Sequence, residues 1–109
     1  MPSQLPTPLR SERDGEIEFQ PEIARFVLGL TARIDSIQDA VASSRWPRLA
    51  DATRQLASEA EAHGFPLLAR RAAETAAASD AEKPDALRDR VQDLTQLARR
   101  VFRGHATPS

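Results

Sequence analysis

Residues 21–41 read PEIARFVLGLTARIDSIQDAV, and the spacing of apolar residues in this stretch indicates the fold class. The apolar stripe consists of Ile23, Phe26, Val27, Leu30, Ile34, Ile37 and Val41. Steps of one, three and four place these side chains on one face of an α-helix. Pro21 suits the first turn of a helix, and residues 43–45 end the pattern. The stretch therefore predicts an amphipathic helix near residues 20–44.

Three further stretches show the same spacing and predict helices near residues 46–63, 66–79 and 84–103. Their stripes consist of Trp46, Leu49, Ala52, Thr53, Leu56, Ala60 and His63; of Leu67, Leu68, Ala69, Ala72, Ala73 and Ala76; and of Leu87, Val91, Leu94, Leu97, Ala98, Val101 and Phe102. Ser44 is a candidate N-cap for the second helix, and Gly64 is a candidate stop for it. Short loops make sequential helices neighbours. We therefore predict an all-α, antiparallel up-down-up-down four-helix bundle, with Leu30, Ile34, Leu56 and Leu94 in its core.

The two ends of the chain differ from the helical stretches. Residues 1–18 combine three prolines and a glycine with charged and small polar residues, and so carry little apolar surface to offset the entropy of ordering. We expect a flexible arm there, with a short helical turn over residues 9–12 left open. Its contacts to the bundle would involve Leu5, Leu9 and Ile17. The bundle itself is expected over residues 19–104, with Gly104 ending the last helix and residues 105–109 forming a disordered tail.

Composition narrows the function classes. The chain has 109 residues, which is room for one domain, and it has no cysteine, which excludes disulfides and thiolate-ligated metals. Its 15 basic and 16 acidic residues nearly cancel, so net charge indicates no nucleic-acid or membrane partner. No run approaches about 18 apolar residues, and the first residues lack the apolar region of a secretory signal. We therefore expect a cytoplasmic protein.

The residues available for catalysis are few. Of the two histidines, His105 falls in the predicted tail, and His63 ends the second predicted helix. A cationic histidine at that point suits the helix dipole, and a half-buried capping ring is the other structural role we consider. The sequence has no pair of histidines at helical spacing and no glycine-rich phosphate loop. We expect no enzyme activity, no cofactor and no metal site.

Residues 46–66, WPRLADATRQLASEAEAHGFP, show a further pattern. Trp46, Leu49, Leu56 and Gly64 fall at the apolar and glycine positions of a helix that reads, loosely, W-x-x-L-x-x-L-A-H-x-L-K-G-x-x-x-x-x-G. The segment from Trp46 to Glu74 resembles the histidine-containing phosphotransfer (HPt) domain of two-component signalling. The preceding residues, which include Phe26, Leu30, Ile34, Ile37, Ala40, Ser44 and Arg45, resemble the family's approach to that helix. The resemblance covers about residues 9–103 and implies a four-helix bundle.

The resemblance fails at the residues that carry the family's chemistry. Arg54 occupies the position of the phosphorylated histidine, Ala57 that of a neighbouring lysine, and Ser58 that of a glycine. A guanidinium stays protonated and has no lone pair to attack a phosphoryl group. His63 lies nine residues after Arg54, which is about 180° around a helix, so it cannot take the same docked position. We therefore expect no phosphotransfer.

The resemblance implies instead a protein-interaction module that docks on a response-regulator receiver or a histidine kinase domain. The candidate docking surface consists of Asp51, Arg54, Ala57, Ser58 and Glu61. Arg54 could pair with the acidic pocket of a receiver, or with a phosphate held there, through charge-assisted hydrogen bonds. It could equally be a solvated residue with Asp51 and Ser58 as its neighbours.

A second hypothesis is a structural or self-associating helical bundle with an unrelated partner. Ile17, Phe19 and Leu28 lie outside the main apolar stripe and could form an exposed apolar patch. Such a patch is typical of protein–protein contact sites. We expect a monomer or a weak homo-oligomer, without nucleic acid or membrane as partner.

Overall fold

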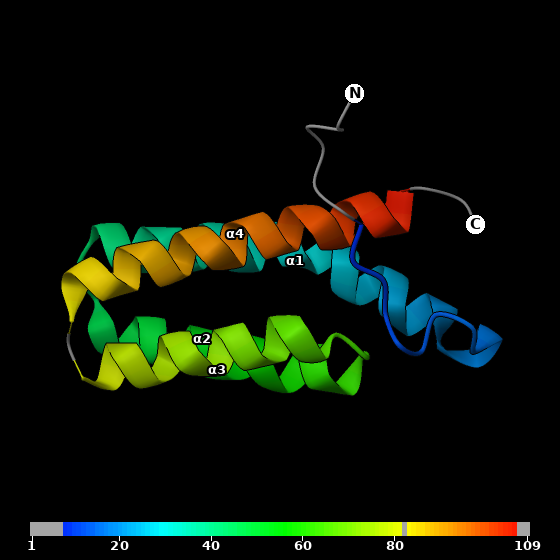
Figure 1. Cartoon of the computed structure of the whole chain (residues 1–109), viewed down its shortest axis with the longest axis horizontal. Helices are drawn as coiled ribbons and strands as arrows, with labels where there is room; N and C mark the ends of the chain where they lie inside the picture. Colours follow the sequence, from blue (N-terminus) through cyan, green and yellow to red (C-terminus); the bar gives the residue numbers. More distant parts are fainter. Residues whose placement is uncertain (1–7, 82, 107–109) are drawn as a thin grey trace, which may run out of the picture.

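The structure, a computed structural model, describes residues 8–81 and 83–106. Four α-helices account for most of these residues: α1 (Gln20–Ala42), α2 (Trp46–Ala62), α3 (Pro66–Asp80) and α4 (Pro84–Ala106). A 3₁₀ turn, η1 (Ile17–Phe19), precedes α1 (Figure 1). The described ranges contain no strand, so the all-α prediction is confirmed. Each observed helix begins and ends within three residues of the predicted limits.

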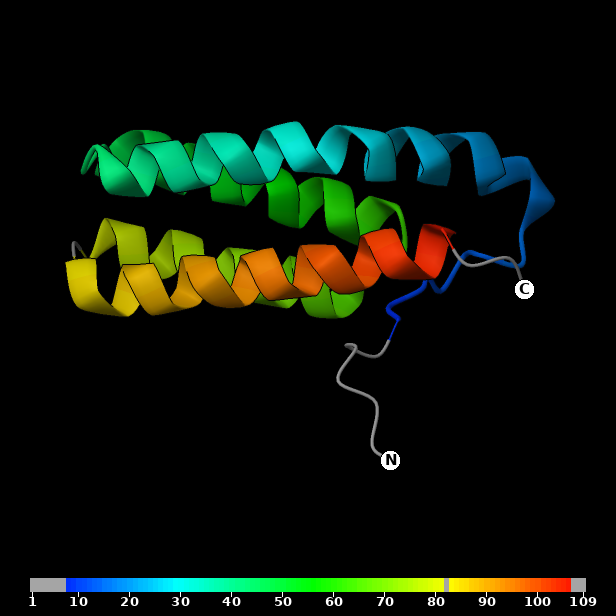
Figure 2. The ribbon, with the colours of Figure 1, turned by 90° about the horizontal axis from the view of Figure 1, so that it is seen from above.

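The helices form two layered pairs. In Figure 1, α4 lies in front of α1, and α3 lies in front of α2. Figure 2 shows the same helices from above. Each helix also contacts the next helix along the chain, and α4 contacts α1. This arrangement is consistent with a four-helix bundle. None of the helices in the described residues is long and apolar enough to cross a membrane.

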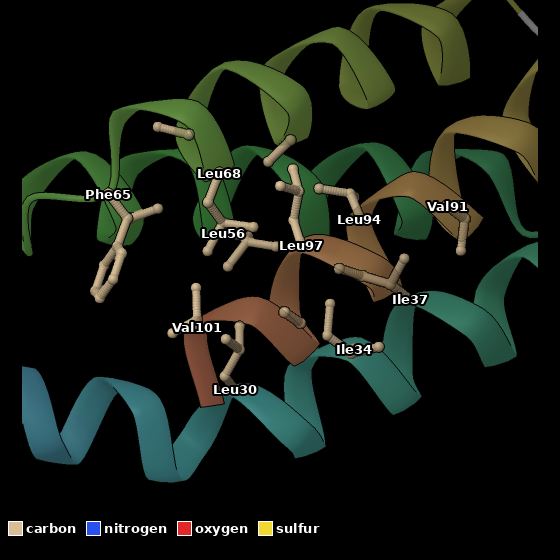
Figure 3. Close-up of a cluster of buried hydrophobic side chains, with 14 of the residues drawn as sticks. Leu30, Ile34, Ile37, Leu56, Phe65, Leu68, Val91, Leu94, Leu97 and Val101 are labelled. Carbon is tan, nitrogen blue, oxygen red and sulfur yellow. The ribbon is translucent and has the colours of Figure 1, made fainter. Parts of the chain in front are cut away.

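The core lies between the four helices and follows the predicted stripes (Figure 3). The predicted core residues Leu30, Ile34, Leu56 and Leu94 are all buried, and their burial confirms that assignment. Further core side chains are Ile23, Phe26, Val27, Ile37, Leu49, Phe65, Leu68, Leu87, Val91, Leu97 and Val101. The prediction that Ala73 belongs to the buried stripe of the third helix is wrong, because Ala73 is exposed on α3.

Two similar turns end α1 and α2. In each turn one residue has positive φ, Ser44 with 55° and Gly64 with 83°. The next amide, of Arg45 or Phe65, donates to a carbonyl five residues back, at 2.9 Å to Ala40 and 2.8 Å to Ala60. This is the Schellman pattern, in which the left-handed residue is usually glycine. The prediction of Ser44 as an N-cap is wrong, because the N-cap of α2 is Arg45, and Ser44 is the left-handed residue of the turn before it.

Residues 8–16 lie against the bundle. The Leu9 amide donates to the Arg100 carbonyl at 2.8 Å, and the Glu12 amide donates to the Gly64 carbonyl at 2.7 Å. Leu9 packs on the core, whereas Ile17 is 85% exposed and its predicted contact is wrong.

The described part of the arm that we predicted over residues 1–18 thus contacts the bundle, and its flexibility stays a prediction. Backbone amides of Leu9 and Glu12 supply part of the attachment, which the apolar content of the arm could not indicate. Residues 1–7, which include Leu5, lie outside the described residues.

Gly104 does not end the last helix. It is buried within α4, which continues to Ala106, so His105 is helical rather than part of a tail. A Cβ atom on Gly104 would stand 2.6 Å from the Leu9 carbonyl oxygen. The glycine therefore allows the arm to approach α4 closely. Close approach of a backbone is a reason for glycine that differs from the positive φ found at Gly64. Residues 107–109 lie outside the described part.

Candidate functional site

The outer face of α2 carries the candidate docking residues above an apolar base. Leu49, Thr53, Leu56 and Ala60 are fully buried on the inner face. The Thr53 hydroxyl is satisfied there, since it donates to the backbone carbonyls of Leu49 and Ala50 at 2.8 and 3.1 Å. The inner face of α2 is therefore held in place by packing and by satisfied hydrogen bonds.

Four of the five predicted docking residues are exposed and follow one another at helical spacing: Asp51, Arg54, Ser58 and Glu61. We call these four residues the α2 ridge. The fifth, Ala57, is half-buried and packs against the core. The ridge carries two carboxylates and one guanidinium, so it is polar and of mixed charge.

Arg54 reaches from the ridge to α3. Its Nη1 lies 3.4 Å from Asp51 Oδ1, and its Nη2 donates to Asp80 Oδ2. The sequence indicated the Asp51 pair, because the two residues are three apart on one helix. Asp80, 26 residues further along the chain, was missed. All three side chains are at least half exposed, so solvent screens these pairs.

A groove of about 220 Å³ lies beside Arg54 and is lined by Trp46, Pro47, Ala50, Asp51, Arg54, Ser79 and Asp80. Ser79 is 1% exposed, and its hydroxyl has no hydrogen-bond partner among the described residues. The guanidinium of Arg54 thus stands at the edge of a groove with carboxylates on both sides.

His63 is the C-cap of α2 and lies on the side of α1. Its ring stacks on Phe26, with centroids 5.0 Å apart and an interplanar angle of 10°. Nδ1 lies 2.7 Å from the Glu59 carbonyl oxygen; a carbonyl only accepts, so Nδ1 carries the proton and donates. The half-buried capping role that we considered for His63 is the one found. Arg54 pairs with α3 whereas His63 stacks on α1, so the two side chains lie on opposite sides of α2.

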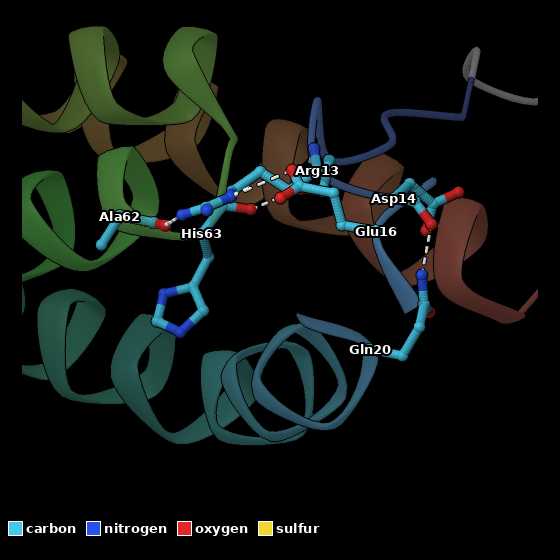
Figure 4. Close-up of polar contacts among 7 residues, drawn as sticks. Arg13, Asp14, Glu16, Gln20, Ala62 and His63 are labelled. Atoms are coloured by element: carbon cyan, nitrogen blue, oxygen red, sulfur yellow. Dashed lines mark hydrogen bonds and ion pairs between the residues drawn. The ribbon is translucent and has the colours of Figure 1, made fainter. Parts of the chain in front are cut away.

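The arm is attached at this same end of α2 (Figure 4). The Ser11 hydroxyl donates to the His63 carbonyl, and Arg13 Nη1 donates to the Ala62 carbonyl at 3.3 Å. The Arg13 guanidinium also lies over the Phe19 ring, 3.4 Å from its centroid. These contacts satisfy carbonyl groups that the end of a helix leaves without partners.

The carboxyl group of Glu74, which lies away from the ridge, has a lowered pKa. The hydrogen bond from Arg71, 2.9 Å long, lowers the pKa of Glu74 below its usual value, and the charges of Arg71 and Arg90 act in the same direction. Glu74 lies 3.6 Å from Arg90 and so connects α3 to α4. Over residues 8–81 and 83–106, no three histidine, aspartate or glutamate side chains are grouped so as to hold a metal ion.

Comparison with known proteins adds no relative. No protein-family model matches the chain, and no curated protein or solved structure matches it. The HPt resemblance therefore rests on the sequence of this chain alone.

Proposed function

We propose that this protein is a pseudo-HPt module that docks on a receiver or histidine kinase domain without carrying phosphate. The proposal includes an antiparallel, up-down-up-down order of the four helices. Three-residue connections and the contacts of consecutive helices support that order. It also includes a cytoplasmic location, with no nucleic acid or membrane as partner.

The observation that carries the proposal is the α2 ridge. Arg54 takes the position of the family's phosphorylated histidine, and it is exposed above the buried side chains of Leu49 and Leu56. A guanidinium offers five donors in a planar fork that matches a carboxylate or a phosphate. Arg54 can therefore contact the acidic pocket into which an HPt histidine would reach.

Docking requires Arg54 to exchange its present partners. The pairs with Asp51 and Asp80 are exposed, and exposed ion pairs contribute about 0–1 kcal/mol each. A two-point pair with a carboxylate shielded in an interface is stronger than an exposed pair. The internal pairs thus hold Arg54 in place without preventing its transfer to a partner.

Phosphotransfer is not part of the proposal. Arg54 has no nucleophilic lone pair. The ring of His63 is stacked on Phe26, and its Nδ1 is engaged by Glu59. The imidazole faces away from the ridge and is only 18% exposed. The protein would occupy a receiver surface rather than supply or remove a phosphoryl group.

Isothermal titration of the chain against a panel of purified receiver domains from the same genome tests this function. We expect binding to at least one receiver, and weakening by about tenfold or more in Arg54→Ala, the loss expected for a charge-assisted bidentate contact. Arg88→Ala is the matched control, because it removes the same charge from an exposed position on α4. Equal loss in both variants, or no binding to any receiver, would contradict the proposal.

A self-associating bundle is the second candidate, and two exposed apolar side chains favour it. Ile17 is 85% exposed and Leu28 is 77% exposed. Phe19, the third member of the predicted patch, is half-buried beneath Arg13. Sedimentation of the protein and of Leu28→Glu separates the candidates: a dimer that Leu28→Glu dissociates would favour self-association.

A further inference from the structure

A second cavity lies at the opposite side of α2 from Arg54, between α1 and the end of α2. Its volume is about 290 Å³, and its lining consists of Glu22, Arg25, Phe26, Gly29, Arg33, Glu59 and His63. None of these residues belongs to the α2 ridge. The cavity is therefore a separate candidate for binding.

Three of the lining residues form a regular stripe on α1. Arg25, Gly29 and Arg33 are spaced four residues apart, which places them on one helix face. Neither arginine forms an ion pair with any residue in the described ranges. Both guanidinium groups thus flank the same glycine and can supply donors to a ligand.

Packing gives no reason for a glycine at position 29. A Cβ atom built there would meet nothing within 4 Å, and the residue has ordinary helical backbone within α1. Glycine inside a helix is destabilising relative to alanine. Gly64 and Gly104, by contrast, are each approached by the arm. The absence of a side chain at Gly29 leaves the surface of α1 open between the two arginines.

His63 supplies a fixed hydrogen-bonding group to the same cavity. Its Nδ1 donates to the Glu59 carbonyl, and its ring is held flat against Phe26. Nε2 has no hydrogen-bond partner among the residues described. With the proton on Nδ1, Nε2 is an acceptor and can receive a hydrogen bond from a ligand. Figure 4 shows this ring between the end of α2 and α1.

Two carboxylates complete the lining and restrict the ligand. Glu22 and Glu59 balance the charges of Arg25 and Arg33, so the cavity with a neutral His63 carries no net charge. A simple anion would be repelled by the carboxylates, and a simple cation by the arginines. A ligand with both an anionic and a cationic group satisfies both sets.

We propose that this cavity binds a small zwitterionic molecule, with an oxyanion between Arg25 and Arg33 and an ammonium group at Glu22, Glu59 and Nε2 of His63. The oxyanion is a phosphate or a carboxylate, since a guanidinium fork suits either. The volume is near the lower end of the range of small-molecule sites, which fits a compact ligand. The inference does not depend on receiver docking, because it involves no ridge residue.

Titration of ¹⁵N-labelled protein with phosphoethanolamine and, separately, with β-alanine tests the proposal and separates phosphate from carboxylate. We expect saturable amide shifts near Gly29 and His63 with at least one probe below about 10 mM. Arg25→Gln and Arg33→Gln should each weaken binding about fivefold or more, as expected for loss of a charge-assisted contact. Gly29→Leu should abolish it by filling the open surface.

Arg48→Gln is the matched control, because Arg48 is exposed on α2 and does not line the cavity. Gly29→Ala shows whether position 29 tolerates a side chain, and we expect it to raise the melting temperature. Absence of saturable shifts with both probes would overturn the proposal. Equal affinity in the wild type, Arg25→Gln and Arg33→Gln would also overturn it, as would equal weakening by Arg48→Gln.

Discussion

Gly64→Ala tests how the turn after α2 and the arm depend on each other. Gly64 has φ of 83°, and the left-handed conformation costs an L-residue about 1–2 kcal/mol. The added Cβ would also stand 2.5 Å from Ser11 Oγ and 3.0 Å from the Arg13 amide nitrogen. A backbone nitrogen cannot move away without displacing the arm, so the strain and the clash act together.

The magnitude follows from these two contributions. Displacement of the arm breaks the bonds from Glu12 to Gly64 and from Ser11 to His63, each with a net value of about 0.5–1.5 kcal/mol. Together with the conformational strain, we expect a loss of about 2–5 kcal/mol in the free energy of unfolding. Urea denaturation followed by circular dichroism measures this loss.

Ser44→Gly is the matched comparison, because Ser44 holds the equivalent place after α1 with φ of 55°. We expect this substitution to raise the free energy of unfolding by about 0.5–1 kcal/mol, since the strain of a left-handed serine, about 1–2 kcal/mol, is removed and the entropy cost of ordering a glycine offsets part of that gain. The reasoning is refuted if the free energy of unfolding of Gly64→Ala lies within about 0.5 kcal/mol of the wild-type value. It is also refuted if Gly64→Ala and Ser44→Gly change the free energy of unfolding in the same direction.

Three further predictions concern single side chains. Leu56→Ala should cost about 2–5 kcal/mol of unfolding free energy in urea denaturation, because Leu56 is fully buried; a midpoint equal to that of the wild type would contradict its place in the core. Glu74→Gln should lower the urea midpoint at neutral pH, and this difference should shrink as pH falls below the usual glutamate pKa: the lowered pKa of Glu74 stabilises the folded state above the usual value, and this contribution is lost as pH falls through the folded value. A pH-independent difference would argue against the ion pair. Ser79→Ala should stabilise by about 1 kcal/mol in thermal unfolding, because it removes a buried hydroxyl without a partner, and a marked loss would mean that the hydroxyl is satisfied.

The four helices could be predicted from the sequence because burial along a helix repeats locally. The core positions of Leu30, Ile34, Leu56 and Leu94 follow from steps of three and four residues. The exposed Ala73 shows the limit of this argument, since alanine is compatible with either face of a helix.

The features that the sequence did not reveal depend on contacts between distant parts of the chain. Gly64 ends a helix and Gly104 does not, although both are single glycines after a helical pattern. The arm approaches both glycines, and part of its attachment comes from backbone amides of Leu9 and Glu12, which carry no sequence signal.

The same limit applies to the site. The pair of Arg54 and Asp51 follows from helical spacing, whereas the pair of Arg54 and Asp80 requires the register of α2 against α3.

The most direct test of receiver docking through α2 is a footprint of the complex by amide chemical shifts. A receiver domain that binds in the titration panel is added to ¹⁵N-labelled protein. We expect the largest shifts and line broadening at Asp51, Arg54, Ser58 and Glu61, with little change on α4, whose backbone does not come close to that of α2. A footprint centred on Ile17 and Leu28, or on α4, with the α2 ridge unchanged, would contradict the account.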